Sequence, residues 1–188
     1  NIAAGVGTDS VTLNEAQTVA ANTYAVKAGA NTIATLTRTI KYSIKDTGAN
    51  IASTNSIGLN KAINIISVDA CTYAQAKVLH DATNSGYNLY DITDSAANIS
   101  AGTITDVNVF SGAQTVTVNN NANVSEASNI ANISKAVIYN ISDTASNLKS
   151  LSSTNSNALN EAVNITSIDS CAFAQAKAIE DATNSGSI

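Results

Sequence analysis

The 188-residue sequence has no proline, methionine or tryptophan, and only 12% of its residues are charged. Nine Lys and Arg residues against fourteen Asp and Glu residues give a formal net charge of −5. The few basic residues are scattered and form no stripe of the kind that nucleic acids require. No apolar run approaches the roughly 18 residues of a membrane-spanning helix, and no segment is basic enough to lie on an anionic membrane. These shortages argue against a nucleic-acid partner and against membrane insertion.

The sequence is also poor in groups that perform catalysis. His80 is the only histidine, and its counterpart in a second copy of the same segment is Glu180. A side chain that glutamate replaces within one molecule is a poor choice for a general base or a metal ligand. Without a second histidine or a paired lysine, no serine or threonine has an activating partner, and no glycine-rich phosphate loop is present. The sequence therefore predicts no enzyme, no catalytic residue and no bound cofactor.

What the sequence does contain is internal duplication. Leu59–Gly86 and Leu159–Gly186 are identical at 18 of 28 positions. A finer repeat lies beneath this one, because short β-branched or aromatic runs each reach an Asp or Asn and are followed by small residues with helical spacing. The acidic or amide residues of this series are Asp46, Asp69, Asp94, Asn119, Asp143 and Asp169.

Strands that alternate with helices favour parallel pairing. The predicted fold is an α/β repeat solenoid with a parallel β-sheet, built from coils of about 24–25 residues paired into units of about 49. The chain, 1–188, is predicted to be a single array. An atypical N-terminal coil, with a strand at Ser10–Asn14, covers 1–38. Six strand–helix coils follow at 39–62, 63–86, 87–112, 113–134, 135–162 and 163–188.

The helix expected after each strand can be described for Cys71–Gly86. Its apolar residues recur at helical spacing, Asp69 is placed to cap its first turn, and Gly86 can take the left-handed conformation that ends a helix. The strands raise a question of register. Counted back from the Asp, the apolar residues have opposite parity in Tyr42–Ile44 and in Ile66–Val68. Either the Asp sits one place differently in alternate coils, which we favour, or alternate strands belong to different sheets.

Two interpretations of the Asp and Asn series are open. Capping and strand-end hydrogen bonding, repeated because the coil repeats, is the one we favour. A ladder of calcium ions is the other, although no glycine-rich calcium nonapeptide and no EF-hand loop is present. Asp91 and Asp94, with Asp106 nearby in sequence, form the densest acidic group and are the best-placed residues for such an ion. No other metal site is predicted.

Cys71 and Cys171 occupy matching positions four coils apart, so they are expected to lie about 20 Å from each other in a parallel stack. A disulfide within the chain is excluded at that distance. The same position in other coils holds Gly48, Ala96 and Ala145, which indicates a cramped inward site. Both cysteines are expected to be buried free thiols, the alternative being a disulfide between chains.

The pattern Tyr-x-Ile-x-Asp-Thr/Ser-x-x-Asn-Ile/Leu stands in the sequence as YSIKDTGANI, YDITDSAANI and YNISDTASNL, beginning at Tyr42, Tyr90 and Tyr139. It resembles repeat segments of very large secreted bacterial surface proteins of the adhesin-like and S-layer-like kinds. The resemblance covers most of the chain from about Thr39 onward. It implies an extracellular, cell-surface location and a structural or adhesive role.

From these observations we expect a non-enzymatic structural protein, a repeat segment or subunit of a bacterial surface layer, fibre or adhesin. Solenoid ends without polar caps expose unpaired strand groups, so the ends are expected to stack head-to-tail on copies of the chain or on flanking repeats. The alternative is an adhesive module whose sheet face binds a surface glycan, with Tyr24, Tyr73 and Phe173 as contacts.

Overall fold

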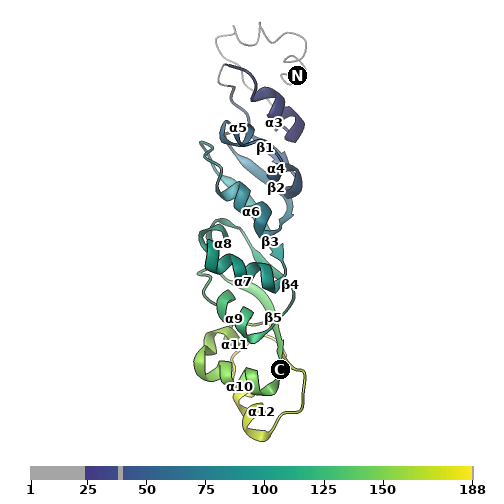
Figure 1. The fold of residues 1–188 in the computed structure, drawn as a ribbon, viewed down its shortest axis with the longest axis vertical. Coiled ribbons are helices and arrows are strands. Elements are labelled where there is room, and N and C mark those ends of the chain that lie inside the picture. Colours follow the sequence, from purple (N-terminus) through teal and green to yellow (C-terminus); the bar gives the residue numbers. More distant parts are fainter. Residues whose placement is uncertain (1–23, 38–39, 188) are drawn as a thin grey trace. The chain divides into compact units, whose positions relative to one another are not determined.

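The computed structural model describes residues 24–37 and 40–187, and in these ranges the chain has an α/β fold (Figure 1). The strand predicted at Ser10–Asn14 lies outside the described residues. The strands are β1 (Ile44–Asp46), β2 (Ile65–Cys71), β3 (Asn88–Asp94), β4 (Val116–Ala122), β5 (Val137–Asp143) and β6 (Ile165–Ser167). The longer helices are α3 (Lys27–Ile33), α6 (Tyr73–His80), α7 (Ala96–Thr105), α9 (Val124–Ile130), α10 (Ala145–Thr154) and α12 (Phe173–Glu180). Four helices of five residues are α4 (Gly48–Ala52), α5 (Ser56–Asn60), α8 (Asn108–Gly112) and α11 (Ser156–Asn160).

The strands are parallel and pair in chain order, β1-β2-β3-β4-β5-β6, in one six-stranded sheet. This confirms the α/β class and the parallel pairing predicted from the sequence. One strand falls within each of the six expected coils. The chain divides into two compact units, and β3 contributes residues to both. Unit 1 is Asn1–Asp91 with Gly112–Gln114, and unit 2 is Ile92–Ser111 with Thr115–Ile188.

In unit 1, β1 and β2 form a parallel pair in which Ile44 lies opposite Ile65 and Asp46 lies opposite Ser67. Ile44 and Ile65 are fully buried. Ala25 forms a further parallel bridge with Ile44. β-Branched residues at these inward positions suit the pleated surface, and their burial supplies the apolar contact between neighbouring strands.

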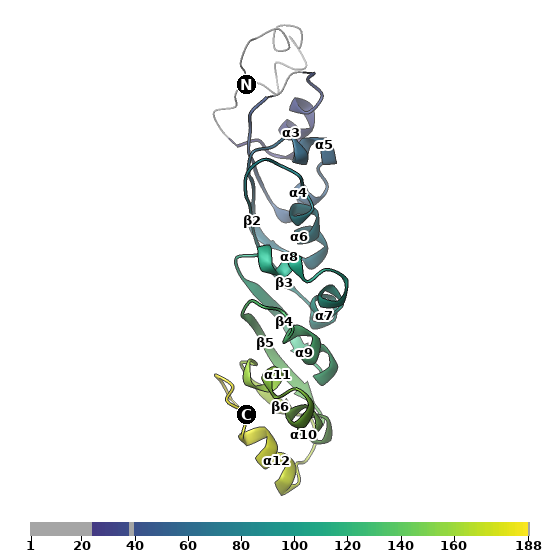
Figure 2. The same cartoon turned by 90° about the vertical axis from the view of Figure 1, so that its left-hand side faces the viewer.

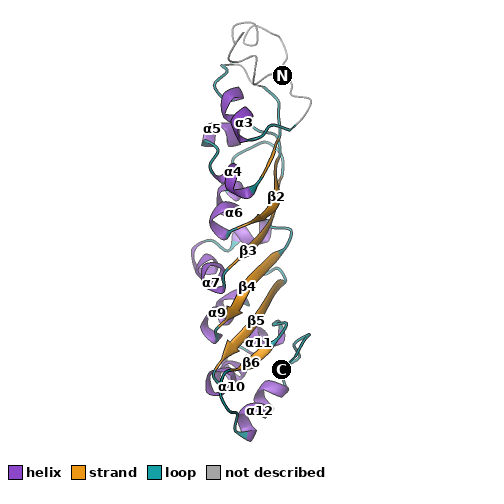
Figure 3. Ribbon diagram, turned by 90° about the vertical axis from the view of Figure 1, so that its right-hand side faces the viewer, coloured by secondary structure: helices purple, strands orange, loops and turns teal. Residues whose placement is uncertain are grey.

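In unit 2, β3, β4, β5 and β6 are neighbours, with Ile92 opposite Val116 and Ile141 opposite Ile165. These four side chains are buried. Helices α9 and α10 lie along one side of β4 and β5, as two opposite views show (Figures 2 and 3). The apolar core of unit 2 is the layer between these helices and the strands.

The register corrects the expected parity. Ile65 is the inward residue of β2, while Val68 is 56% exposed, so the apolar pair chosen from the sequence points outward. Asp46 pairs with Ser67, and Asp69 lies two residues further along β2. The offset between the two Asp residues is therefore two residues and not the one residue expected. In β4 a bulge separates Thr117, opposite Ile138, from Asn121, opposite Asn140. A two-residue offset keeps the same face inward, so neither a one-residue shift nor a second sheet is needed.

The tyrosines of the repeated pattern anchor short helices. The buried Tyr42 hydroxyl donates to the Gly58 carbonyl oxygen of α5 at 2.5 Å. In unit 2 the buried Tyr139 hydroxyl donates to the Ala158 carbonyl oxygen of α11 at 2.6 Å. Burial raises the pKa of Tyr42 to about 12, so the hydroxyl stays protonated and able to donate.

Helix α6 begins and ends differently from the prediction. Strand β2 continues to Cys71, so the helix starts at Tyr73 and its N-cap is Thr72, which corrects the assignment of Asp69 as the cap. Thr72 Oγ1 accepts from Gln75 N, and Gln75 Oε1 accepts from Thr72 N, a reciprocal capping box. The helix ends at His80, before the predicted stop.

Gly86 has a different role from the one expected. No described glycine has a positive φ angle, so the left-handed helix stop is wrong. A Cβ atom at Gly86 would instead collide with Asn64 Oδ1 and with the Ile63 carbonyl oxygen. The glycine is required because the chain passes close to the preceding strand.

Two isoleucines on opposite faces of β5 provide a direct test of the core. Ile141 is fully buried and Ile138 is 56% exposed on the same strand. Ile141→Ala removes buried methyl groups and leaves a cavity, so we expect it to lower the free energy of unfolding by about 2–5 kcal/mol. The control Ile138→Ala is expected to change it by about 0.5 kcal/mol or less. Urea unfolding of both variants measures the difference, and equal losses would contradict the assigned faces.

Candidate functional site

The polar side chains of the repeated pattern meet where one coil adjoins the next. We call them the coil-joining residues. In each case the N–H of the first residue of a helix donates to a side-chain oxygen carried by the following strand or the turn after it. In unit 1 these pairs are Lys27 N to Asp46 Oδ2 (2.9 Å) and Gly48 N to Asp69 Oδ1 (2.7 Å). In unit 2 they are Ala96 N to Asn120 Oδ1 (2.7 Å), Val124 N to Asp143 Oδ2 (3.0 Å) and Ala145 N to Asp169 Oδ1 (2.6 Å).

These contacts have a simple physical basis. The first N–H groups of a helix have no partner within the helix, and they lie at the positive end of its dipole. A carboxylate is the strongest acceptor available for them. Because the acceptor belongs to the next coil, the same bond that satisfies a helix end also fixes the position of a neighbouring strand.

The coil-joining Asp residues at the ends of odd-numbered strands are held by a second set of bonds. Asp143 Oδ1 accepts from Thr144 N at 2.8 Å and from Asn147 Nδ2 at 2.7 Å. Thr144 is the N-cap of α10, and its side chain accepts from Asn147 N. The pattern Asp-Thr/Ser-x-x-Asn is therefore a helix start in which each polar residue has a partner. Asp46 and Asp94 form the same local bonds.

Even-numbered strands deliver the acceptor through the two-residue offset. Ser67 Oγ donates to the Asp69 carboxylate at 3.1 Å, and Ser167 Oγ donates to the Asp169 carboxylate at 3.0 Å. In β4 the acceptor is Asn120 and not Asn119, which is exposed and corrects the predicted series. The sequence has three consecutive asparagines, Asn119–Asn121, and only the register of the sheet shows which of them accepts the hydrogen bond from the helix.

Two of these carboxyl groups have altered acidity. Partial burial by itself would raise the pKa of Asp46 and of Asp143. Hydrogen bonds from backbone N–H groups and from Asn50 or Asn147 outweigh that effect and hold the pKa of both groups below the ordinary value. Both carboxylates are therefore ionised in the folded chain at neutral pH.

Asparagine side chains add further contacts between coils in the duplicated segments. In the second copy, Asn160 Oδ1 accepts from Thr183 N at 3.0 Å and Asn164 Oδ1 accepts from Ser187 N at 2.9 Å. In the first copy, the matching bonds run from Thr83 N to Asn60 Oδ1 and from Tyr87 N to Asn64 Oδ1. The abundance of Asn in the sequence thus has a structural use, because amides replace backbone partners in the turns.

The two cysteines differ. Cys71 is fully buried, and burial is the main reason that its thiol pKa is raised. It faces a cramped site, because a Cβ at Gly48 would lie 2.6 Å from its sulfur. Cys171 is exposed, which corrects the expectation of two buried thiols. The equivalent residue Ala122 is fully buried and lies opposite Ile141 of β5.

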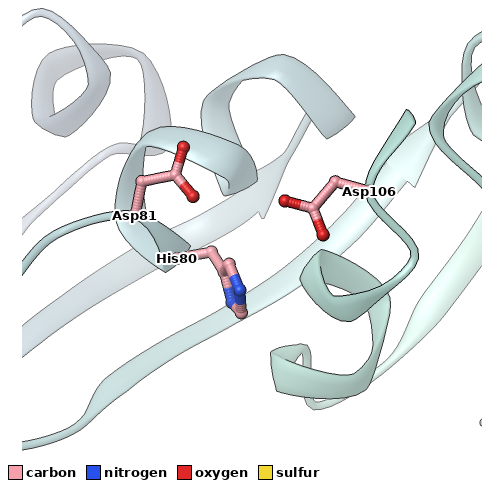
Figure 4. A group of neighbouring side chains, drawn as sticks. All are labelled: His80, Asp81 and Asp106. Carbon is pink, nitrogen blue, oxygen red and sulfur yellow. The ribbon is translucent and has the colours of Figure 1, made fainter.

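The acidic residues considered for calcium are divided between the two units, with Asp91 in unit 1 and Asp94 and Asp106 in unit 2. Asp91 and Asp94 lie three residues apart on β3 and so point to opposite faces, and Asp94 Oδ1 accepts from Ser95 N and Asn98 Nδ2. Asp106 is the C-cap of α7, whereas His80 and Asp81 lie at the C-terminal end of α6 (Figure 4). Each unit taken by itself has, among its described residues, no group of three such side chains able to hold one ion.

The aromatic residues proposed as glycan contacts are on different elements. Tyr24 precedes α3 and Phe173 begins α12, and both are exposed, whereas Tyr73 begins α6 and is half-buried. Tyr73 and Phe173 therefore lie on helices and not on strands of the sheet, and their role as glycan contacts stays a prediction. Unit 2 also has a shallow groove of about 600 Å³, and none of the described residues that line it is aromatic. The lining residues are Asn121, Asn140, Asn164, Ile165, Thr166, Ser167 and Ser187.

Comparison with protein-family models, with curated proteins and with solved structures gives no match for this chain. Among the described residues, none of the helices combines the length and the apolar character needed to cross a membrane.

The lowered pKa of Asp143 predicts how stability changes with pH. A carboxyl group whose folded pKa is depressed stabilises the fold above its ordinary pKa, and this contribution is lost as the pH falls through the folded pKa. We expect Asp143→Asn to lower the free energy of unfolding on the order of 1 kcal/mol at neutral pH and to reduce the loss of stability on acidification.

The control is Asp181→Asn, because Asp181 forms only an exposed ion pair with Lys177 in the last helix of the same unit. Urea unfolding across the acidic range compares the two variants. An acid dependence of Asp143→Asn identical to that of the parent chain would contradict the assigned role.

Proposed function

We propose that this chain is a non-enzymatic structural repeat protein whose strand–helix coils stack as an α/β solenoid. We place it at the bacterial cell surface, as a segment or subunit of a surface layer, fibre or adhesin that assembles end to end. One observation carries the proposal. The acidic and amide side chains that recur along the sequence bond helix N-termini within a coil or in the preceding coil.

The bonds between coils support this proposal in both units. Five helix N-termini are joined to side chains 19 to 24 residues further along the chain. Such bonds stabilise each coil only through its neighbour, which is the energetic property of a stacked array. An array that grows by repetition of one contact is suited to spanning distance and bearing load.

Assembly of the full chain tests the proposal. We expect oligomers that grow with protein concentration, seen by light scattering, and ordered fibres or lattices in electron microscopy. Ile141→Ala should reduce assembly because it weakens the fold, whereas Ile138→Ala should not. A chain that stays monomeric at every concentration would contradict the proposal, and so would reproducible turnover of a substrate that a single substitution abolishes.

A glycan-binding adhesive module is the second candidate, and the amide-lined groove of unit 2 favours it. Asn and Thr side chains can donate to and accept from sugar hydroxyl groups. Retention on a glycan array that is lost in Asn121→Ala would support this function. Asn121 is the suitable residue because, unlike Asn140 and Asn164, its side chain forms no hydrogen bond with another coil among the described contacts.

A further inference from the structure

The last coil of unit 2 exposes positions that are buried in an earlier coil of the same kind. Ala122 ends β4 and Ala127 is the fourth residue of α9, and both are fully buried. Their counterparts Cys171 and Ala176, at the same positions before and within α12, are exposed. Phe173, the first residue of α12, is 85% exposed. We call Cys171, Phe173 and Ala176 the uncovered face.

Unit 2 itself contains the segment that covers the equivalent face of β4 and α9. Strand β5 pairs with β4 so that Ala122 lies opposite Ile141. The Asp143 carboxylate accepts from Val124 N, the first N–H of α9. Asn155 Nδ2 also donates to Ser128 Oγ of α9 at 3.0 Å. The covering segment is thus a strand–helix coil that carries the Tyr-x-Ile-x-Asp-Thr/Ser-x-x-Asn pattern.

Unit 1 provides a second and independent case. Helix α3 has Ala30 as its fourth residue, which matches the exposed Ala176 of α12, and Ala30 is fully buried. Its first N–H, from Lys27, donates to Asp46 at the end of β1. The strand that follows a helix of this type is again a Tyr-x-Ile-x-Asp strand, beginning at Tyr42.

We infer that the uncovered face is an interface for a strand–helix coil of the Tyr-x-Ile-x-Asp-Thr/Ser-x-x-Asn type. The incoming strand runs parallel to β6, its Asp accepts from the N-terminus of α12, and its apolar residues bury Cys171 and Ala176. The first bond of such a strand is already present, because Ile165 N donates to Ser187 O at 3.0 Å as Ile65 N donates to Tyr87 O. This inference rests on the proposed stacking and names the partner that the stacking requires.

The test adds such a coil to the full chain. A copy of residues 88–114 is appended directly after Ser187, and alkylation of Cys171 by a soluble thiol reagent is followed with Cys71 as the buried internal reference. We expect alkylation of Cys171 to slow by at least about tenfold, because a residue in a docked coil reacts only when that coil opens. An unchanged rate would overturn the inference.

Matched variants separate docking from simple crowding of the thiol. The same extension in scrambled order should leave Cys171 fully reactive, and Asp94→Ala in the appended copy alone should restore part of the reactivity. Phe173→Asp in the extended chain should also weaken protection. Ile168→Ser should not, because Ile168 is exposed and so is its counterpart Val68 in the first copy. Protection by the scrambled extension would contradict the inference.

The outcomes distinguish this interface from the proposed function. Protection of Cys171 in the extended chain, combined with a parent chain that never assembles, would support the interface and contradict the surface-assembly proposal. Assembly of the parent chain that Phe173→Asp does not alter, combined with an unprotected Cys171 in the extended chain, would support assembly through another surface and overturn the interface.

Discussion

The fold depends on one recurring hydrogen bond, from the first N–H of a helix to a side-chain oxygen that belongs to the next coil. Five such bonds are present in the described residues, at 2.6 to 3.0 Å. Each one satisfies a helix end that would otherwise be unpaired and also holds the following strand in register. Local structure and long-range order are therefore stabilised by the same atoms, and loss of one acceptor weakens both.

Two kinds of coil deliver this acceptor in different ways. Odd-numbered strands end directly in Asp, and a tyrosine lies four residues before it. The hydroxyl of Tyr139 in β5 donates to a carbonyl oxygen of the short helix α11. Even-numbered strands lack that tyrosine, and their acceptor lies two residues beyond the residue paired with the preceding Asp. Ser67 of β2 and Ser167 of β6 donate to the acceptor Asp, whereas in β4 the acceptor Asn120 lies in a bulge. The alternation explains why the sequence repeats over about 49 residues and not over a single coil, and why its Asp and Asn residues recur so regularly.

The α/β class and the parallel pairing of strands could be predicted from the sequence because they depend on periodicity alone. The inward face of β2 could not be predicted, because Ile65, Ile66 and Val68 are all apolar. Only the pairing of Ile65 with Ile44 determines which face is buried. Asn120 was missed for the same reason. Three helix N-caps could have been predicted from the sequence, because Asp-Thr/Ser-x-x-Asn is a recognisable helix start. They are Thr47, Ser95 and Thr144. The exposure of Cys171 depends on what lies beside it in space, which no local pattern encodes.

The two-residue bulge in β4 has a consequence for how the length of this strand can vary. Side chains alternate between the faces of a strand, so a change in strand length by one residue turns the apolar set toward solvent, whereas a change by two preserves it. The bulge forms a loop in which Asn119, Asn120 and Asn121 are all exposed and the next residue, Ala122, returns inward. An insertion or deletion of two residues at this point of β4 would therefore keep the apolar side chains on the inward face, whereas one of a single residue would not.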